Sequence, residues 1–303
     1  MTRKFLWRVI LLLLITNVLT AGIWLLNRND GEANTVEDFS VEVDQKEPVA
    51  TIGGEEITYN HWVSTLEEEY GREALEKMVN EEVITQLAKE QEVTINDEVI
   101  DLELSLLFTM EGVLTEEEIA VKQREWTKGI KNRIYLEELS TQDIAVSEQE
   151  IQTYFNEYKG QYEFSHSIQV SHILLNNETA ANKVIDELES GASFAALARE
   201  YTLDDATKRD GGYLGYYTET SSFLHSDYFQ QAIGMEEHTY SDPFRIGNNG
   251  RIAIIYLHRE LPDINLSYNT LYNHIRREIA LTKMEKTPEP SDLWNQLEVD
   301  WIY

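Results

Sequence analysis

Residues 168–175 constrain the fold most, because they read as a strand with one histidine at its middle. Two sets of side chains alternate along this stretch: Ile168, Val170, His172 and Leu174 against Gln169, Ser171 and Ile173. This period of two places the two sets on opposite faces of a sheet. A histidine among apolar neighbours is about twice as often a hydrogen-bonded core residue as a functional one.

The glycines of Asp210-Gly211-Gly212-Tyr213-Leu214-Gly215 favour a functional role for this histidine. Three glycines in so short a stretch predict backbone with positive φ, or a close approach to another segment. We therefore expect this loop to be the partner of the histidine-bearing strand.

The segments around the strand and the loop predict a mixed α and β unit. Helical spacing occurs at residues 180–188, from Ser193 onward, and at residues 228–235. An edge strand is predicted at residues 243–246, and a longer apolar strand at 251–258. Residues 203–210 read as a polar loop.

Helical periodicity fills most of the chain before residue 164 and resumes after Pro262. Two capping-box patterns, Thr115-x-x-Glu118 and Ser147-x-x-Glu150, predict helix starts, and residues 49–57 read as a short hairpin around Gly53-Gly54. Large apolar residues crowd the C-terminus and must pack on something: Leu293, Trp294, Leu297, Val299, Trp301 and Ile302. We expect them to cover the N-terminal helices, so that both halves form one discontinuous helical domain.

The N-terminus predicts an uncleaved membrane anchor. Residues 5–26 are nearly all apolar, and about 20 such residues span a bilayer as a helix. Arg3, Lys4 and Arg8 lie before or within the run, so the positive-inside rule keeps residues 1–28 as a cytoplasmic stub and anchor and exports the remainder. A cleaved signal peptide is the competing interpretation, but its apolar region is usually shorter. Residues 29–47 are polar and acidic and read as a linker.

Composition excludes several functions. The chain of 303 residues carries 55 acidic and 25 basic side chains, a net charge of -30, and therefore repels phosphate backbones; we expect no nucleic-acid partner. It has no cysteine, which excludes disulfides, thiolate metal sites and cysteine nucleophiles. No metal-ligand spacing is apparent, and we expect neither a metal nor another cofactor.

Four motifs in order resemble the parvulin-type peptidyl-prolyl cis/trans isomerases. They are Val170-Ser171-His172-Ile173-Leu174, the helix Phe194-Ala195-Ala196-Leu197-Ala198-Arg199-Glu200-Tyr201, Asp210-Gly211-Gly212-Tyr213-Leu214-Gly215-Tyr216 and Asp242-Pro243-Phe244. The flanking segments are similar to the chaperone region of PrsA/SurA-type extracytoplasmic foldases. The resemblance implies an α+β fold, with a parvulin-like α/β domain of antiparallel sheet and surrounding helices at 165–260, inserted in a helical chaperone domain at 48–164 and 261–303.

By motif position, the resemblance also implies a site. His172 and Asp204 would form the catalytic polar network, with Asp205 as the alternative when counting back from Gly215. Leu214, Leu224 and Tyr228 would form the pocket for the proline ring.

Two residues depart from the family pattern. Ala253 stands where the last strand usually carries a second histidine, and Tyr213 stands where aspartate is common. A histidine that loses its ring-to-ring hydrogen bond has fewer partners to fix its tautomer. Both changes point toward weaker catalysis.

The expected function is that of a single-pass, membrane-anchored foldase with its bulk outside the cytoplasm. It would assist secreted proteins by isomerising X-Pro bonds in unfolded or partly folded exported polypeptides. The alternative is a non-catalytic chaperone or holdase that uses a degenerate parvulin domain to bind peptides. A third hypothesis is a membrane protein that scaffolds partners through its acidic helices.

Overall fold

The computed structural model describes residues 44–247 and 250–303. They belong to two compact units, Met1–Arg72 and Glu73–Tyr303. The anchor expected at residues 5–26 lies outside the described residues, as does most of the linker expected at 29–47. Within the described ranges, no helix has the length and apolar content that a membrane span requires.

The first unit contains the predicted hairpin. Strand β1 (Pro48–Ile52) pairs antiparallel with β2 (Glu55–Thr58), and both connecting glycines have positive φ, 61° at Gly53 and 94° at Gly54. Helix α2 (Tyr59–Leu66) follows, with the Thr58 side chain as its N-cap, and continues into the π-helical turn η1 (Glu67–Gly71).

The second unit contains two groups of elements, and the first group is helical. It consists of α3 (Arg72–Glu90), α4 (Asp97–Thr109), α5 (Glu116–Thr141), α6 (Glu148–Tyr158), the short turn η2 (Lys159–Tyr162) and α10 (Tyr268–Lys283). Both predicted capping boxes are present, because Thr115 and Ser147 each exchange hydrogen bonds with the glutamate three residues later.

Segments from both ends of the second unit share one apolar core. Ile100, Ile134 and Ile151 pack with Leu271 and Ile275 of α10. The strands that lead into and out of the sheet also pair, since β3 (Glu163–Phe164) lies antiparallel to β9 (Ile264–Asn265). The helical elements before residue 163 and after residue 265 therefore pack together.

The C-terminal tail packs on helix α3, as its apolar content predicts. The short turn η4 (Pro290–Gln296) buries Leu293 against Val83 and Leu87. The Trp294 Nε1 atom donates a hydrogen bond to Asn80 Oδ1 over 2.7 Å. Ile302 differs from this expectation, because 83% of its surface stays exposed.

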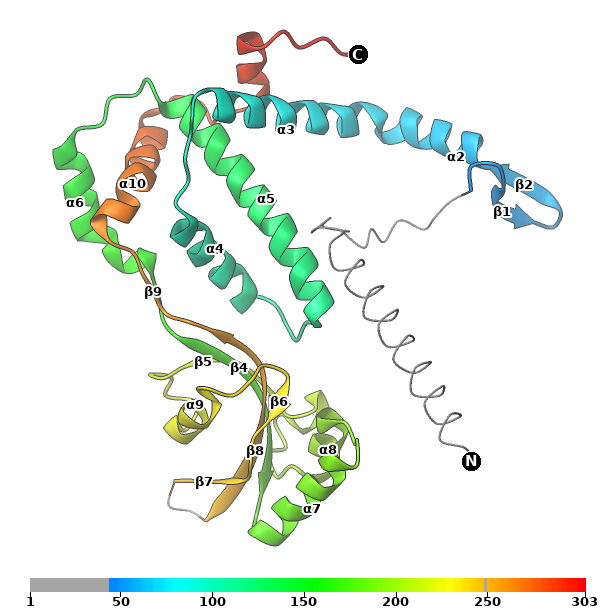
Figure 1. Ribbon diagram of the computed structural model, residues 1–303, viewed down its shortest axis with the longest axis vertical. Coiled ribbons are helices and arrows are strands. Elements are labelled where there is room, and N and C mark those ends of the chain that lie inside the picture. The colour runs from blue at the N-terminus through cyan, green and yellow to red at the C-terminus, as the bar shows by residue number, and fades with distance from the viewer. Residues whose placement is uncertain (1–43, 248–249) are drawn as a thin grey trace, which may run out of the picture. The chain divides into compact units, whose positions relative to one another are not determined.

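The second group is an antiparallel sheet with helices on both faces (Figure 1). Its strand order is β5 (Tyr213–Thr218), β4 (Ser167–Leu175), β8 (Arg251–Leu261) and β6 (Thr239–Tyr240), and β7 (Phe244–Ile246) also pairs with β8. Helices α7 (Glu178–Glu189) and α8 (Phe194–Tyr201) pack on one face, and α9 (Ser226–Ala232) packs on the other.

The period of two predicted for residues 168–175 is confirmed by these two faces. Ile168, Val170 and Leu174 belong to the apolar cluster that includes α9, whereas Ile173 and Leu175 belong to the cluster that includes α7 and α8. All nine residues of β4 are buried. The glycine loop differs from expectation, because its second half continues into β5, a strand that pairs with β4.

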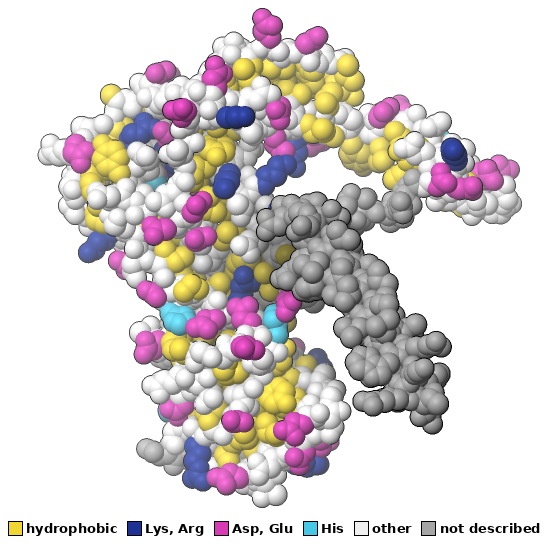
Figure 2. All heavy atoms as spheres, in the orientation of Figure 1, with side chains coloured by type: hydrophobic (Ala, Val, Ile, Leu, Met, Phe, Trp, Pro, Cys, Tyr) yellow, Lys and Arg dark blue, Asp and Glu magenta, His cyan; other side chains and the backbone are white. Residues whose placement is uncertain are grey.

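Charged side chains remain outside these cores. Figure 2 shows acidic side chains scattered over the visible face of the helices and of the sheet unit, with fewer lysines and arginines among them. This distribution matches the net charge of -30.

Candidate functional site

His172 lies at the middle of the central strand β4 and only 5% of its surface is exposed. Both ring nitrogens have hydrogen-bond partners. Nδ1 lies 2.8 Å from the hydroxyl of Tyr228 on α9, and Nε2 lies 3.0 Å from Oδ2 of Asp204, in the loop after α8. The structure thus brings together three of the five residues that the resemblance singled out.

The loop after α8 holds Asp204 through local hydrogen bonds. The Thr207 hydroxyl donates to Oδ2 over 2.8 Å, and the backbone N–H of Ala206 donates to Oδ1 over 3.1 Å. Partial burial disfavours the carboxylate, but these two bonds and His172 outweigh it and lower the pKa of Asp204. Asp205 is exposed, so Asp204 is the aspartate that contacts the histidine.

These partners determine the tautomer of His172. An ionised Asp204 only accepts hydrogen bonds, so Nε2 carries the proton and Nδ1 accepts from the Tyr228 hydroxyl. Burial lowers the pKa of His172, and Asp204 offsets only part of that shift. Burial also raises the pKa of Tyr228, with a further contribution from Asp204, which keeps its hydroxyl protonated. The network is therefore a neutral histidine between a fixed donor and a fixed acceptor.

The predicted close approach of the glycine loop occurs at this histidine. The backbone N–H of His172 donates to the Gly212 carbonyl over 2.8 Å. Gly212 has a φ of +80°, and a Cβ atom there would lie 2.1 Å from the His172 carbonyl oxygen. Only glycine fits this position, because a methyl group would collide with the backbone of β4.

The three predicted pocket residues lie in one apolar cluster. Tyr228 is buried, and Leu214 and Leu224 pack beside it and stay half-exposed. The ring of Phe244 meets that of Tyr228 edge to face, with centroids 5.5 Å apart. Phe223, next to Leu224, is 93% exposed. The site thus combines a buried polar network with an adjacent, partly open apolar surface.

Ala253 occupies the face of the sheet that carries His172. It pairs with Leu174 across β4 and β8 and belongs to the same apolar cluster as Tyr228. Another histidine of β8, His258, faces the opposite side, where its Nε2 atom lies 2.7 Å from the Ser171 hydroxyl. His258 therefore does not replace the missing ring-to-ring contact.

Sequence reasoning missed two threonines of the network. The hydroxyl of Thr207 lies 3.2 Å from His172 Nε2 as well as bonding to Asp204. The Thr202 hydroxyl accepts from the backbone N–H of Leu174 and of Asp204, which ties the loop to β4. The signal that could have found Thr207 is its place only three residues after Asp204, which lets the two side chains meet within one turn of the loop.

We expect acid to destabilise this sheet unit. The pKa of His172 is lowered, and burial together with His238 lowers the pKa of His258 to about 4. The unfolded chain binds these protons first as the pH falls, so the free energy of unfolding decreases between the ordinary pKa of 6.5 and about 4. Urea unfolding followed by circular dichroism measures this decrease, and His258→Gln should flatten it. A midpoint that stays constant or rises toward acid pH contradicts the expectation.

Metal binding finds no support in the described ranges. No group of three or more histidine, aspartate or glutamate side chains within residues 44–247 and 250–303 is arranged to hold a metal ion.

Comparisons with known proteins identify the family of the chain. The PPIC-type PPIASE domain matches residues 155–240. The chain is 31% identical over 304 residues to a putative peptidyl-prolyl cis-trans isomerase, YacD, of Bacillus subtilis, and the alignment covers 100% of this chain and 98% of that protein. It is 30% identical over 207 residues to the foldase protein PrsA of Halalkalibacterium halodurans, which covers 64% of this chain and 60% of that one.

Among solved structures, the crystal structure of PrsA from Bacillus subtilis aligns with 84% of this chain and 92% of that one, at 20% identity and a TM-score of 0.28. The family assignment depends instead on the full-length relative and on the domain match. The chain belongs to the family of PPIC-type, or parvulin, peptidyl-prolyl cis-trans isomerases.

Proposed function

We propose that this protein is a foldase that catalyses peptidyl-prolyl cis/trans isomerisation in unfolded or partly folded exported polypeptides. The observation that carries the proposal is the neutral His172, bonded at both ring nitrogens beside half-exposed apolar side chains. Membrane anchoring, with the N-terminus in the cytoplasm and the bulk outside, is part of the proposal and is supported by the apolar residues 5–26.

The chemistry needs no covalent step. Rotation about an X-Pro bond meets a barrier of about 18–20 kcal/mol, because it breaks the amide resonance. A catalyst has only to bind the twisted amide better than either planar form. The planar amide is the more polar of the two, so an apolar, water-poor surface favours the twisted one.

The described residues can provide that surface. Leu214, Leu224 and Phe244 would contact the pyrrolidine ring around the ring of Tyr228. His172 is buried and Asp204 is half-buried, so they act on the substrate through Tyr228. His172 Nδ1 accepts a hydrogen bond from the Tyr228 hydroxyl, and Asp204 holds the histidine ring in place through Nε2. In this proposal, the network keeps the Tyr228 ring in one orientation and leaves no buried group without a partner.

A specific observation favours a second candidate, a holdase without isomerase activity. Ala253 is fully buried on the His172 face, and its side chain has no hydrogen-bonding group. A parvulin domain that has lost this polar position could still bind extended peptides. The helical core would then carry the chaperone function.

One experiment separates the two candidates. Isomerisation of a short proline peptide is measured with the purified full chain and with its Ala253→His variant, beside a test of whether each prevents aggregation of an unfolded client. We expect the wild-type chain to accelerate isomerisation about tenfold or more, which corresponds to about 1.4 kcal/mol of barrier. An inactive wild type that prevents aggregation, together with an active Ala253→His variant, would favour the holdase.

The same assay tests the proposed orientation. The proline peptide is added to intact cells from which the wall has been removed. Because the peptide does not cross the membrane, it reaches only a site on the outer side. Activity that appears only after lysis would contradict an extracytoplasmic site.

A further inference from the structure

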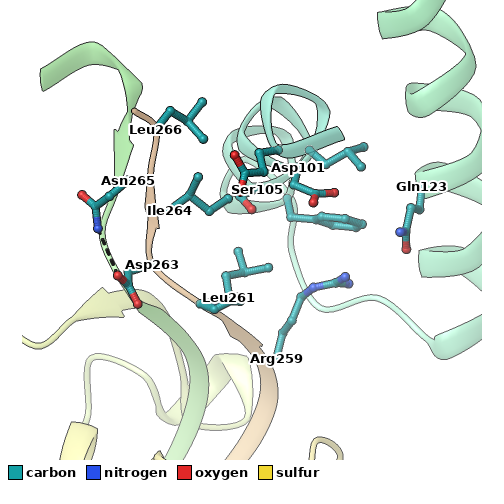
Figure 3. A pocket seen from close by; sticks show the side chains of 13 residues that line it. Asp101, Ser105, Gln123, Arg259, Leu261, Asp263, Ile264, Asn265 and Leu266 are labelled. Atoms are coloured by element: carbon teal, nitrogen blue, oxygen red, sulfur yellow. Dashed lines mark hydrogen bonds between the residues drawn. The ribbon is translucent and has the colours of Figure 1, made fainter. Parts of the chain in front are cut away.

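A second cavity lies away from the histidine, where the helical elements meet the end of strand β8. It has a volume of about 360 Å³, which falls within the range of roughly 300–1,000 Å³ for ligand sites. Its apolar lining comes from α4, from the last residue of β8 and from the segment that follows: Leu104, Phe108, Leu261, Ile264 and Leu266. The polar residues around these side chains are shown in Figure 3.

Arg259 is the unusual member of this lining. Its guanidinium stacks on the Phe108 ring, with 3.6 Å between Cζ and the ring centroid. The Nε and Nη1 atoms are buried, and neither has a hydrogen-bond partner among the described residues. Burial lowers the pKa of Arg259. In Figure 3 the side chain points from β8 toward Asp101 and Gln123.

Buried donors without partners destabilise a folded protein, because they have lost their hydrogen bonds to water and gained none in exchange. Here the Nε and Nη1 atoms have already lost their water in the free protein, although Arg259 as a whole is half-buried. A ligand that supplies an acceptor to either atom, after a small rotation of the side chain, therefore gains a hydrogen bond without having to strip water from that atom.

The charged side chains around the cavity determine which kind of ligand group can accept a hydrogen bond from Arg259. Glu98, Asp101 and Asp263 also line it, and all three are exposed. Partial burial raises the pKa of Asp101, and the neighbouring Asp97 and Glu98 raise it further, so the local field already opposes another negative charge. A neutral carbonyl oxygen fits beside Arg259 better than a carboxylate, and a cationic group fits at the acidic side chains.

We propose that this cavity binds an extended segment of the client polypeptide in which an apolar side chain precedes lysine or arginine. A backbone carbonyl of the segment accepts from Arg259, the apolar side chain contacts Leu104 and Leu261, and the basic side chain lies near Asp101 and Glu98. The inference rests on the proposed function for its client, an unfolded chain, but it requires no proline.

Short fluorescein-labelled peptides without proline test this site in the full chain. Each carries Leu-Lys, Leu-Gln or Leu-Glu in a Gly/Ser background, and fluorescence anisotropy measures the Kd. We expect Leu-Lys to bind most tightly and Leu-Glu most weakly. Raising the salt from 0.1 M to 1 M, which shortens the Debye length from about 10 Å to about 3 Å, should weaken Leu-Lys and leave Leu-Gln nearly unchanged.

Arg259→Met identifies the residue responsible, because it keeps an apolar side chain on Phe108 and removes the donors. We expect about a tenfold weaker Kd for both Leu-Lys and Leu-Gln, a loss of about 1.4 kcal/mol. Arg245→Met is the matched control, since Arg245 is an exposed arginine of β7 paired with Glu178, and it should leave both values unchanged.

Three outcomes would overturn the proposal: an unchanged Kd in Arg259→Met, tightest binding of Leu-Glu, or salt-insensitive binding of Leu-Lys. The last two are measured on the wild-type chain, so they remain decisive if Arg259→Met fails to fold. Isomerisation is measured separately with a proline peptide that lacks Leu-Lys. If isomerisation is absent while the peptides still bind as expected, the proposed enzymatic activity is refuted but the proposed binding site is not.

Discussion

Gly212→Ala is expected to lower the free energy of unfolding of the sheet unit by about 2–5 kcal/mol. Forcing alanine to a positive φ costs about 1–2 kcal/mol, and overpacking a tight contact typically costs about 1–3 kcal/mol more. The second contribution follows from the 2.1 Å that would separate the new Cβ from the His172 carbonyl oxygen. A loss of this size is a large fraction of the stability of an ordinary domain.

Gly215→Ala provides the matched control. Gly215 also has a positive φ, +96°, but nothing lies within 4 Å of a Cβ placed there. It should therefore show only the backbone contribution. Urea unfolding followed by far-ultraviolet circular dichroism compares the two variants, and equal losses would mean that the close approach to His172 does not matter.

Asp204→Ala is expected to reduce the isomerase activity about tenfold or more, the equivalent of about 1.4 kcal/mol in the barrier. The substitution leaves His172 Nε2–H without its carboxylate acceptor and removes the partner of the Thr207 hydroxyl. The histidine can then change tautomer or rotate, and the Tyr228 hydroxyl loses a fixed acceptor. The effect should appear in kcat/KM for a short proline peptide.

Asp205→Ala is the adjacent control, because this aspartate is exposed. It removes the same charge from the same loop and should retain full activity. Equal losses in both variants would assign the effect to the charge of the loop rather than to the bond with His172. Full activity in Asp204→Ala would remove the network from the proposed mechanism.

Local patterns predicted the elements whose residues have one strong periodicity. Strand β4 and the starts of α5 and α6 were predicted because alternation and capping boxes act within a few residues. Strand β5 was missed, since Gly215 and the two glycines just before the strand indicate a loop, and its pairing with β4 depends on a segment far away in the chain.

In the candidate site too, features that depend on distant segments or on packing could not be predicted from local sequence patterns. His172 and Asp204 are 32 positions apart, and only the family resemblance connected them before the structure placed their side chains 3.0 Å apart. Thr207 and the hydrogen bond from Tyr228 were not predicted, because no periodicity reports a side-chain hydroxyl. Arg259 could not be predicted either: within the part of the chain that the structure describes, its Nε and Nη1 atoms lack hydrogen-bond partners because of the packing around Phe108, not because of its place in the sequence.

The pairing of β3 with β9 has a consequence for the modularity of the chain. Phe164 lies opposite Ile264, so the long segment between them leaves the helical core and returns to it at one point. Core residues on either side, such as Ile151 and Leu271, belong to one apolar cluster, to which that segment adds Leu261 near its end and Tyr216 near its middle. An excursion with adjacent ends can be lengthened, exchanged or locally unfolded with little effect on the element that carries it. The sheet unit is therefore joined to the helical core through one pair of adjacent chain ends, as an inserted domain is.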